Sequence, residues 1–288
     1  MADRERRGFW SSFQYVTIIG GQLTALALLV VLQALLGEDA MRTWGWRIGF
    51  GAGAVLAIVV FFIRRKLDET LSYENVAAKA ERRRSSAVNL FRDHPREAFL
   101  VMALTAGGTA AFYAYTIYLQ QFLANTSGFD NATASRIMTV ALALMLLIQP
   151  LAGRLSDHIG RKPMMIFFGA SATLFTYPIF ATLEGTQSVP AAFALVMATL
   201  VIVTGYTSIN AIIKAEMFPA DIRALGVALP FAIANAIFGG TAPSVALWMK
   251  QIGHENWFYI YISLLAAMSL IAYVRMRETK TTSLIEED

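Results

Sequence analysis

Residues 153–163 read GRLSDHIGRKP and separate two stretches that contain no charged residue, 137–153 and 164–183. The glycines in this segment permit a tight reversal of the chain. Asp157 can accept hydrogen bonds from backbone N–H groups at the start of a helix. Arg161 and Lys162 can hold their charges at a membrane surface while their carbon chains stay in an apolar environment. The segment therefore predicts a short polar turn between two membrane-spanning helices.

The same alternation of uncharged stretches and charged gaps runs through the whole chain. The uncharged stretches are 8–37, 48–63, 98–129, 137–153, 164–183, 185–213, 224–249 and 256–274. Of the 24 Lys and Arg residues, all but Arg42, Arg47, Arg136 and Lys250 lie in alternate gaps. Positively charged residues of short loops stay on the cytoplasmic side of a membrane. The pattern predicts eight spans, with both termini in the cytoplasm.

The composition favours an all-α membrane protein. Hydrophobic residues make up 56% of the chain and charged residues 15%, and the mean hydropathy is +0.52, whereas a soluble domain has about 25% charged residues. The stretches are too long and too uniformly apolar for barrel strands, so a helix bundle is predicted. The absence of Cys excludes disulfides and thiolate chemistry. The net charge of +4 comes from the loops, so we predict a lipid bilayer as partner and no nucleic acid.

The chain contains an internal repeat. Arg7-Gly8, followed by Gly20-Gly21, resembles the segment 223–226, RALG, followed by Gly239-Gly240. The basic, acidic and Thr residues of 65–70 likewise resemble those of 275–279. A parallel repeat of this kind is one way in which transporters are built. The four spans within 98–213 should then have copies too, and these would precede Met1. We therefore predict a twelve-helix protein of which this chain, N-terminally incomplete, is the C-terminal two thirds.

Two polar gaps resemble motifs of the major facilitator superfamily. Residues 153–163 resemble its G-x-x-x-D-x-x-G-R-[RK] loop between the eighth and ninth helices, and 216–226, EMFPADIRALG, resemble its E-x-F-P-x-x-x-R-x-x-G loop between the tenth and eleventh. The resemblance implies a major facilitator helix bundle. It also implies three parts: 1–63 as helices five and six, 64–97 as a cytoplasmic linker, and 98–288 as the C-terminal six-helix half with a cytoplasmic tail.

Further segments resemble the metabolite:proton symporter branch, most closely its 2-oxoglutarate permeases; they are 8–22, 44–48, 214–219 and 235–240. This resemblance implies a secondary active transporter that carries 2-oxoglutarate or a similar dicarboxylate together with a proton across a bacterial cytoplasmic (inner) membrane. Another organic acid, or a zwitterion such as proline or betaine, is the alternative substrate. A non-transporting, truncated membrane protein is the alternative from another class. Because alternating access moves one half against the other, we expect this chain alone to be inactive in uptake.

The resemblance also implies a gate network, which we define as Asp157, Arg161, Glu216 and Arg223. In the family such residues close the cytoplasmic side in the outward-facing state and separate in the inward-facing state. Ion pairs at helix ends gain from the helix dipole and from partial desolvation. Solvated loop charges are the alternative interpretation. The repeat further predicts that Asp157 meets the start of the first helix near residues 6–8.

Polar residues at helical spacing mark a candidate cavity in 109–120 and again in 199–214. Polar side chains that face lipid are unfavourable, so these stripes should face the interior of the bundle, either as ligand contacts or as hydrogen bonds between helices. Further amides and phenols lie on the first and seventh spans. The candidate substrate-binding residues are Gln14, Tyr15, Gln22, Tyr113, Thr116, Gln120, Tyr206, Asn210 and Asn235.

These candidates can orient a dicarboxylate but cannot neutralise it. We expect the buried cation and the proton-coupling group in the helices that precede this chain, and we expect Lys214 to extend to the membrane surface. His94, His158 and His254 lie in polar gaps and are predicted to be surface residues. No catalytic, phosphate-binding or metal-binding motif occurs, so we predict no enzyme activity, no cofactor and no metal. The oligomeric state stays open.

Overall fold

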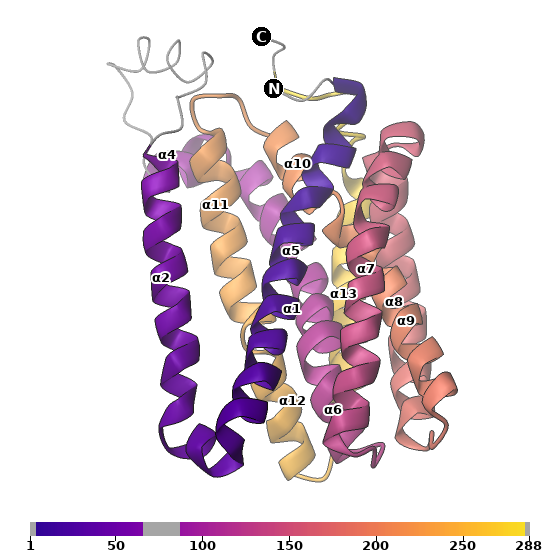
Figure 1. Cartoon of the computed structure of the whole chain (residues 1–288). Helices are drawn as coiled ribbons and strands as arrows, with labels where there is room; N and C mark the ends of the chain where they lie inside the picture. The colour runs from indigo at the N-terminus through magenta and orange to yellow at the C-terminus, as the bar shows by residue number, and fades with distance from the viewer. Residues whose placement is uncertain (1–3, 66–86, 286–288) are drawn as a thin grey trace.

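The structure is a computed structural model that describes residues 4–65 and 87–285, and every regular element in these ranges is helical. Among the described residues, eight helical segments are long and apolar enough to cross a membrane. They are Arg7–Gly37, Thr43–Arg64, Pro95–Asn125, Asn131–Ile159, Arg161–Glu184, Val189–Glu216, Arg223–Gln251 and Glu255–Arg275. The predicted helix bundle with eight spans is confirmed (Figure 1).

Five spans are formed by one long helix each: α1 (Arg7–Ala40), α2 (Trp46–Arg64), α7 (Asn131–Ile159), α8 (Arg161–Glu184) and α13 (Glu255–Arg275). The other three spans are pairs of shorter helices: α5 (Pro95–Tyr113) with α6 (Leu119–Asn125), α9 (Val189–Thr207) with α10 (Asn210–Glu216), and α11 (Arg223–Ala234) with α12 (Ala242–Gln251). A π-helical turn, η2 (Met41–Gly45), joins α1 to α2.

The three interrupted spans carry most of the candidate binding residues. α5 continues into α6 through a π-helical turn, η4 (Ala114–Tyr118), and α11 leads into α12 through another, η5 (Asn235–Gly239). α9 and α10 are separated at 208–209. Local widening of a helix changes where side chains point and leaves backbone groups outside the regular hydrogen-bond pattern, and π-turns are frequent at functional sites. The three interrupted spans, which contain α5, α9 and α11, are therefore candidates for the substrate-binding site.

The hydrophobic core lies among the helices of 95–275. α13 packs against α5 and α8, α9 packs against α7 and α8, and α11 packs against α5. α1 joins this assembly by packing along α7. By contrast, α2 has no buried residue and stands at the edge of the bundle, connected mainly through η2 and α1 (Figure 1). The first span is therefore part of the core assembly, and the second is not.

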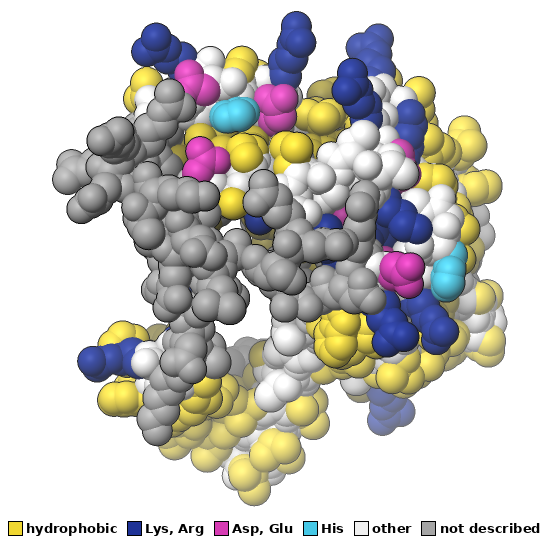
Figure 2. Space-filling view, turned by 90° about the horizontal axis from the view of Figure 1, so that it is seen from above, with side chains coloured by type: hydrophobic (Ala, Val, Ile, Leu, Met, Phe, Trp, Pro, Cys, Tyr) yellow, Lys and Arg dark blue, Asp and Glu magenta, His cyan; other side chains and the backbone are white. Residues whose placement is uncertain are grey.

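One end of the bundle carries most of its positive charge. We call it the basic end, and it contains the start of α1, the end of α7, the end of α10 and α4 (Ala87–Asp93) (Figure 1). Seen from above, Lys and Arg side chains stand around this face (Figure 2). Gly160 ends α7 here with φ 98°, a left-handed conformation that favours glycine, and α8 starts at the next residue. Residues 153–159 of the motif belong to the end of α7, and the predicted reversal is made at Gly160.

The segment predicted as a linker, 64–97, contains more helix than expected. α4 forms within it, and α5 already begins at Pro95. The reason is burial: Leu90 of α4 is fully buried in a small hydrophobic cluster with Ala98, Phe218 and Ile222. A helix of about two turns that buries one leucine leaves no periodic apolar pattern in the sequence. Residues 66–86, which include most of the basic run, lie outside the described residues.

Candidate functional site

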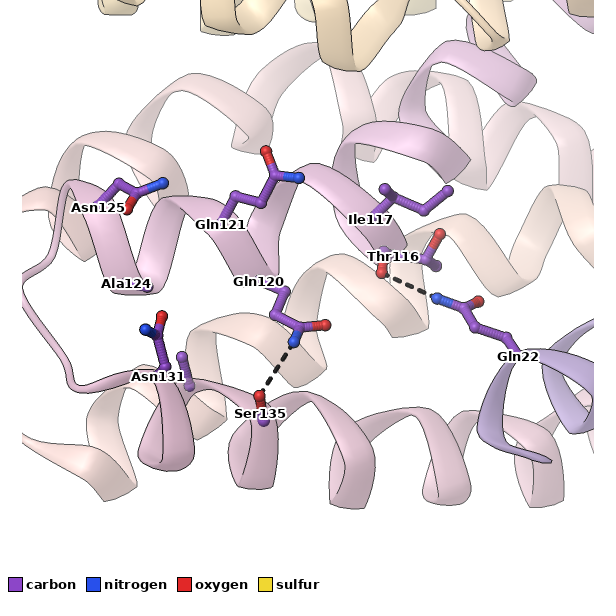
Figure 3. A pocket seen from close by; sticks show the side chains of 10 residues that line it. Gln22, Thr116, Ile117, Gln120, Gln121, Ala124, Asn125, Asn131 and Ser135 are labelled. Atoms are coloured by element: carbon purple, nitrogen blue, oxygen red, sulfur yellow. Dashed lines mark hydrogen bonds between the residues drawn. The ribbon is translucent and has the colours of Figure 1, made fainter. Parts of the chain in front are cut away.

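A pocket opens between α1, the α5–η4–α6 span and α7, in the half of the bundle away from the basic end (Figure 3). Its volume is about 270 Å³. Amide side chains dominate its wall. The lining residues are Gln22, Thr116, Ile117, Gln120, Gln121, Ala124, Asn125, Asn131, Ala134 and Ser135. Gln22, Thr116 and Gln120, three of the predicted binding residues, are therefore brought together from α1, η4 and α6.

Two hydrogen bonds hold amides of this pocket in place. Nε2 of Gln22 donates to the carbonyl oxygen of Thr116 at 3.3 Å, and Nε2 of Gln120 donates to the hydroxyl of Ser135 at 3.1 Å. A side-chain amide has two N–H donors and an acceptor oxygen, so each can still bind a polar ligand. All the lining residues are uncharged. The pocket can orient a polar or carboxylate-bearing molecule, but it supplies no formal charge.

The other predicted residues of α1, α5 and η5 do not line this pocket. Tyr15 is buried, with its ring edge-to-face on Phe112 at a centroid distance of 5.1 Å. Tyr113 and Asn235 converge on Gly239, where an added Cβ would lie 3.0 Å from Oδ1 of Asn235. Gln14 is exposed on α1. The structure thus places Tyr15, Tyr113 and Asn235 at helix interfaces.

Tyr206 and Asn210 are buried nearer the basic end. The ring of Tyr206 packs on Phe168 at 5.4 Å between centroids, and it lies so close to Gly108 that any side chain there would collide with it. Asn210 is 2% exposed, and its Oδ1 has no hydrogen-bond partner among the described residues. These two residues belong to the bundle interior but not to the pocket of Figure 3.

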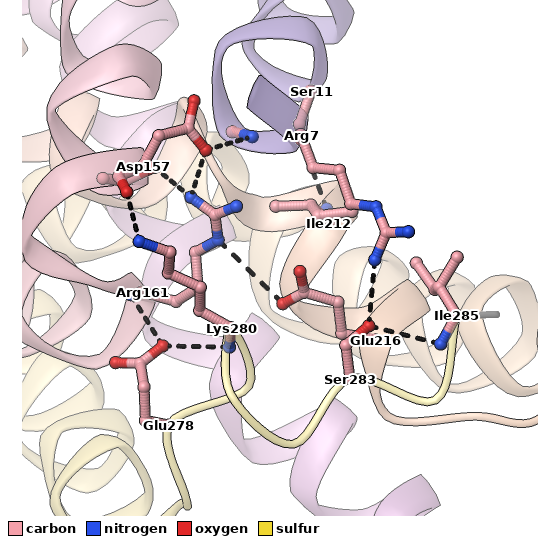
Figure 4. Close-up of polar contacts among 12 residues, drawn as sticks. Arg7, Ser11, Asp157, Arg161, Ile212, Glu216, Glu278, Lys280, Ser283 and Ile285 are labelled. Carbon is pink, nitrogen blue, oxygen red and sulfur yellow. Dashed lines mark hydrogen bonds and ion pairs between the residues drawn. The ribbon is translucent and has the colours of Figure 1, made fainter. Parts of the chain in front are cut away.

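At the basic end, Asp157 joins α7 to the first turn of α1 (Figure 4). Its Oδ1 accepts from the backbone N–H of Gly8 and its Oδ2 from that of Phe9, both at 2.8 Å. A carboxylate at a helix N-terminus satisfies free N–H groups and is favoured by the helix dipole. The contact is the one that the internal repeat predicts. Asp157 itself is only 6% exposed, so it is not a solvated loop residue.

Arg161 is fully buried beneath this contact. The prediction that its charge lies at the membrane surface is therefore wrong. Its Nη1 donates to Oδ1 of Asp157 at 2.9 Å and to the hydroxyl of Ser156 at 2.7 Å. Its Nε lies 4.0 Å from Oε2 of Glu216, which brings α10 into the same cluster. Three members of the gate network therefore form one chain of charges across α1, α7, α8 and α10.

The chain segment after α13 adds two residues that sequence analysis missed (Figure 4). Glu278 accepts from the backbone N–H groups of Arg161 and Lys162, both at 2.9 Å, and thereby caps α8. Nζ of Lys280 donates to the carbonyl of Asp157. The sequence did mark Glu278 as a candidate, because it lies in the repeated segment 275–279. Its partner, however, lies more than a hundred residues earlier in the chain.

Arg223, the fourth member predicted for the gate network, makes different contacts. Its Nε donates to the carbonyl of Phe218 at 3.0 Å, and its Nη2 donates to the carbonyl of Leu284 at 2.9 Å. These bonds fix the loop between α10 and α11 to the C-terminal segment. The structure thus places Arg223 beside the cluster of Asp157, Arg161 and Glu216.

The position of the Lys214 side chain differs most from the prediction. The prediction that it extends to the membrane surface is wrong, because its side chain is buried, with 1% of the residue exposed. Its Nζ lies 4.1 Å from the centroid of the Phe231 ring. Its Nζ also lies 5.8 Å from the centroid of the Tyr206 ring on α9, so the side chain faces the interior of the bundle. A cation therefore lies inside the bundle, where the sequence predicted only uncharged groups.

The described residues include no group of three or more His, Asp or Glu side chains placed to hold a metal ion. The pocket wall offers amides and hydroxyls, which bind ligands through hydrogen bonds. The site is therefore suited to reversible binding, and the charged cluster at the basic end is suited to holding helices together.

Comparison with known proteins agrees with this geometry. The model of the Major Facilitator Superfamily matches residues 1–214 and 109–287. The chain is 52% identical over 267 residues to the alpha-ketoglutarate permease of Escherichia coli, covering 92% of this chain and 61% of the permease. It is 27% identical to the ectoine/proline transporter ProP of Corynebacterium glutamicum, covering 99% of this chain and 59% of that protein. The chain thus spans about three fifths of the length of these relatives.

A crystal structure of a double-tryptophan mutant of XylE has the same fold, with a TM-score of 0.66 over 98% of this chain and 67% of that one, at 16% sequence identity. The family match covers nearly all of the chain, and the spans and the charged turn at 153–163 agree with it. These relatives are transporters rather than enzymes. The chain is a multi-pass membrane protein that belongs to the major facilitator superfamily.

Proposed function

We propose that this chain takes part in proton-coupled uptake of 2-oxoglutarate, or of a similar dicarboxylate, across a bacterial cytoplasmic membrane. The observation that carries the proposal is the 52% identity to the Escherichia coli alpha-ketoglutarate permease over 92% of the chain. The proline, betaine and ectoine transporters among its relatives are far less similar, at 24% to 28% identity. We further propose that α1 and α2 belong to an N-terminal half and 98–288 to a C-terminal half.

The pocket of Figure 3 supports a substrate with several oxygen acceptors. Its amides come from α1 on one side and from α6 and α7 on the other. A ligand held between them would contact both proposed halves. Transporters of this kind place the substrate between halves that rock against each other, so such a ligand would respond to their movement.

The cluster at the basic end supports a gate. Asp157 accepts hydrogen bonds from α1 and from Arg161, and Arg161 forms an ion pair with Glu216 of α10 at 4.0 Å. We propose that this end is cytoplasmic and that the contacts close it when the substrate pocket is accessible from the opposite side. The distribution of Lys and Arg supports the same orientation, with both termini in the cytoplasm.

The test is uptake by a chimera. The part of the Escherichia coli permease that precedes the matched region is joined to this chain, and the product is placed in vesicles with an imposed pH gradient. We expect accumulation of labelled 2-oxoglutarate that stops when the gradient is collapsed. Accumulation that ignores the gradient would contradict proton coupling. A chimera that inserts correctly but accumulates no dicarboxylate would contradict the proposed substrate.

A zwitterion is the second candidate, because proline and betaine transporters are among the relatives and the pocket wall is uncharged. The same vesicles distinguish the two candidates. Labelled 2-oxoglutarate is challenged with excess succinate, proline or glycine betaine. Competition by succinate alone favours the dicarboxylate, whereas competition by proline or betaine favours the zwitterion.

A further inference from the structure

Lys214 is a buried cation held between aromatic rings. It is 1% exposed, and its Nζ lies 4.1 Å from the centroid of Phe231 on α11 and 5.8 Å from that of Tyr206 on α9. Phe231 is only partly buried, so the residue that contacts the ammonium group reaches the surface of the described bundle. The ammonium therefore lies one side chain away from the surface of the bundle.

Within the described residues, Nζ of Lys214 has no hydrogen-bond partner and makes no ion pair. Glu216, the acid nearest in sequence, is directed to Arg161. One turn before Lys214, Oδ1 of Asn210 is also buried without a partner. Buried polar groups in native proteins are nearly always paired, and a charge inside a membrane bundle is kept only at a high energetic cost.

Aromatic rings alone do not replace the missing partner. A ring face attracts a cation, but it supplies no hydrogen-bond acceptor for the three N–H donors of an ammonium group. A planar anion with two oxygens, such as a carboxylate, can accept hydrogen bonds from Nζ of Lys214.

We propose that Lys214 binds a carboxylate group of the transported substrate, which enters when the ring of Phe231 moves aside. This inference rests on the proposed function. It assigns the cation that the amide pocket lacks to α10, within this chain. The pocket amides orient the substrate on the far side of the bundle, and Lys214 receives a carboxylate nearer the basic end. A substrate that passes through the bundle would meet the two in turn.

The test measures binding and stability together, on the purified chain in lipid nanodiscs. Binding of labelled 2-oxoglutarate, proline and glycine betaine, all of which carry a carboxylate, is compared for the unsubstituted chain, Lys214→Met and Lys214→Arg. We expect Lys214→Met to weaken binding at least tenfold while the thermal unfolding midpoint stays the same or rises, because an unpaired buried charge is removed. Lys214→Arg should keep affinity within a few-fold. Arg136→Met, which removes a charge from the exposed face of α7, is the matched control and should bind normally.

Three results would overturn the inference. One is Lys214→Met binding within twofold of the unsubstituted chain. Another is a lowered unfolding midpoint in Lys214→Met with affinity unchanged, which would show that the charge pairs within the protein. The third is the absence of carboxylate binding by the unsubstituted chain. Binding of proline or betaine in place of 2-oxoglutarate, lost in Lys214→Met, would support the role of Lys214 and contradict the proposed dicarboxylate.

Discussion

The carboxylate of Asp157 accepts one hydrogen bond on each oxygen from the first turn of α1, and Oδ1 also accepts from Arg161. Two of the three donors belong to α1 and the third, Arg161, belongs to α8. The side chain of Asp157 on α7 therefore connects these three helices. A charge at a helix N-terminus contributes about 0.3 to 1 kcal/mol, and up to ~2 kcal/mol when partly buried. Asp157 is nearly buried, which places it toward the upper value.

We therefore expect Asp157→Asn to loosen the basic end without preventing membrane insertion. A loss of about 1.4 kcal/mol changes the ratio of closed to open states tenfold. The reporter is Ser12→Cys, because the chain has no other cysteine and Ser12 is fully buried where α1 meets α7. Maleimide labelling of this cysteine should be several-fold faster in the Asn variant.

Asp221→Asn is the control for this experiment. Asp221 lies at the same end of the bundle but is exposed, so the same loss of charge should leave the labelling rate unchanged. Equal labelling rates in the Asp157 variant and the unsubstituted protein would mean that the carboxylate does not hold the helices together.

At the scale of elements, α1 and α7 approach closely because each has a glycine at the crossing. A Cβ added to Gly153 would lie 2.5 Å from the backbone carbonyl oxygen of Gly8, an atom that cannot rotate away. Overpacking costs about 1–3 kcal/mol, against about 1 kcal/mol gained from placing Ala instead of Gly in a helix. We expect Gly153→Ala to lower the unfolding midpoint and to speed labelling at Ser12→Cys.

Gly49→Ala on α2 is the matched control. An added Cβ at Gly49 would meet no atom within 4 Å, so only the gain in helix propensity remains. The unfolding midpoint should stay equal or rise slightly. An equal unfolding midpoint in the Gly153→Ala and Gly49→Ala variants would show that the close approach of α1 and α7 does not stabilise the protein.

The cap on α8 gives a second prediction for an element. Glu278 satisfies two backbone N–H groups that a helix start leaves unpaired. Loss of a capping side chain costs about 0.5–2 kcal/mol. Glu278→Ala should therefore lower the thermal unfolding midpoint, whereas Glu184→Ala should not, because Glu184 is exposed at the negative end of the same helix. A similar decrease for both variants would contradict a capping role.

At the scale of the whole molecule, the proposed orientation can be tested because the chain has no cysteine. Ser188→Cys and His158→Cys introduce exposed thiols at opposite ends of the bundle. In intact spheroplasts we expect an impermeant maleimide to label position 188 and to label position 158 only after permeabilisation. The reverse pattern would contradict cytoplasmic termini.

Sequence patterns predicted the spans well because every lipid-facing turn must be apolar, whichever helix it belongs to. They did not predict burial. The span that contains α2, in which no residue is buried, is more apolar than the span Pro95–Asn125 in the core, so hydropathy does not indicate which helix is buried. The position of Asp157 followed from the repeat, since both copies place a basic-Gly start after a polar turn. Glu278 could not be placed, because its partners at the start of α8 lie more than a hundred residues earlier in the chain. Lys214 could not be placed, because its contact with Phe231 depends on how α11 packs against α10.

The segment after α13 also bears on how the protein is handled in the laboratory. It touches three parts of the basic end, with Ser283 on Arg7, the N–H of Leu284 on the carbonyl of Glu216, and Arg223 on the carbonyl of Leu284. A purification tag or fluorescent protein fused directly to the C-terminus would disturb all three of these hydrogen bonds. A spacer before the tag, or a tag inserted in the turn at 185–188 on the opposite face, leaves them undisturbed.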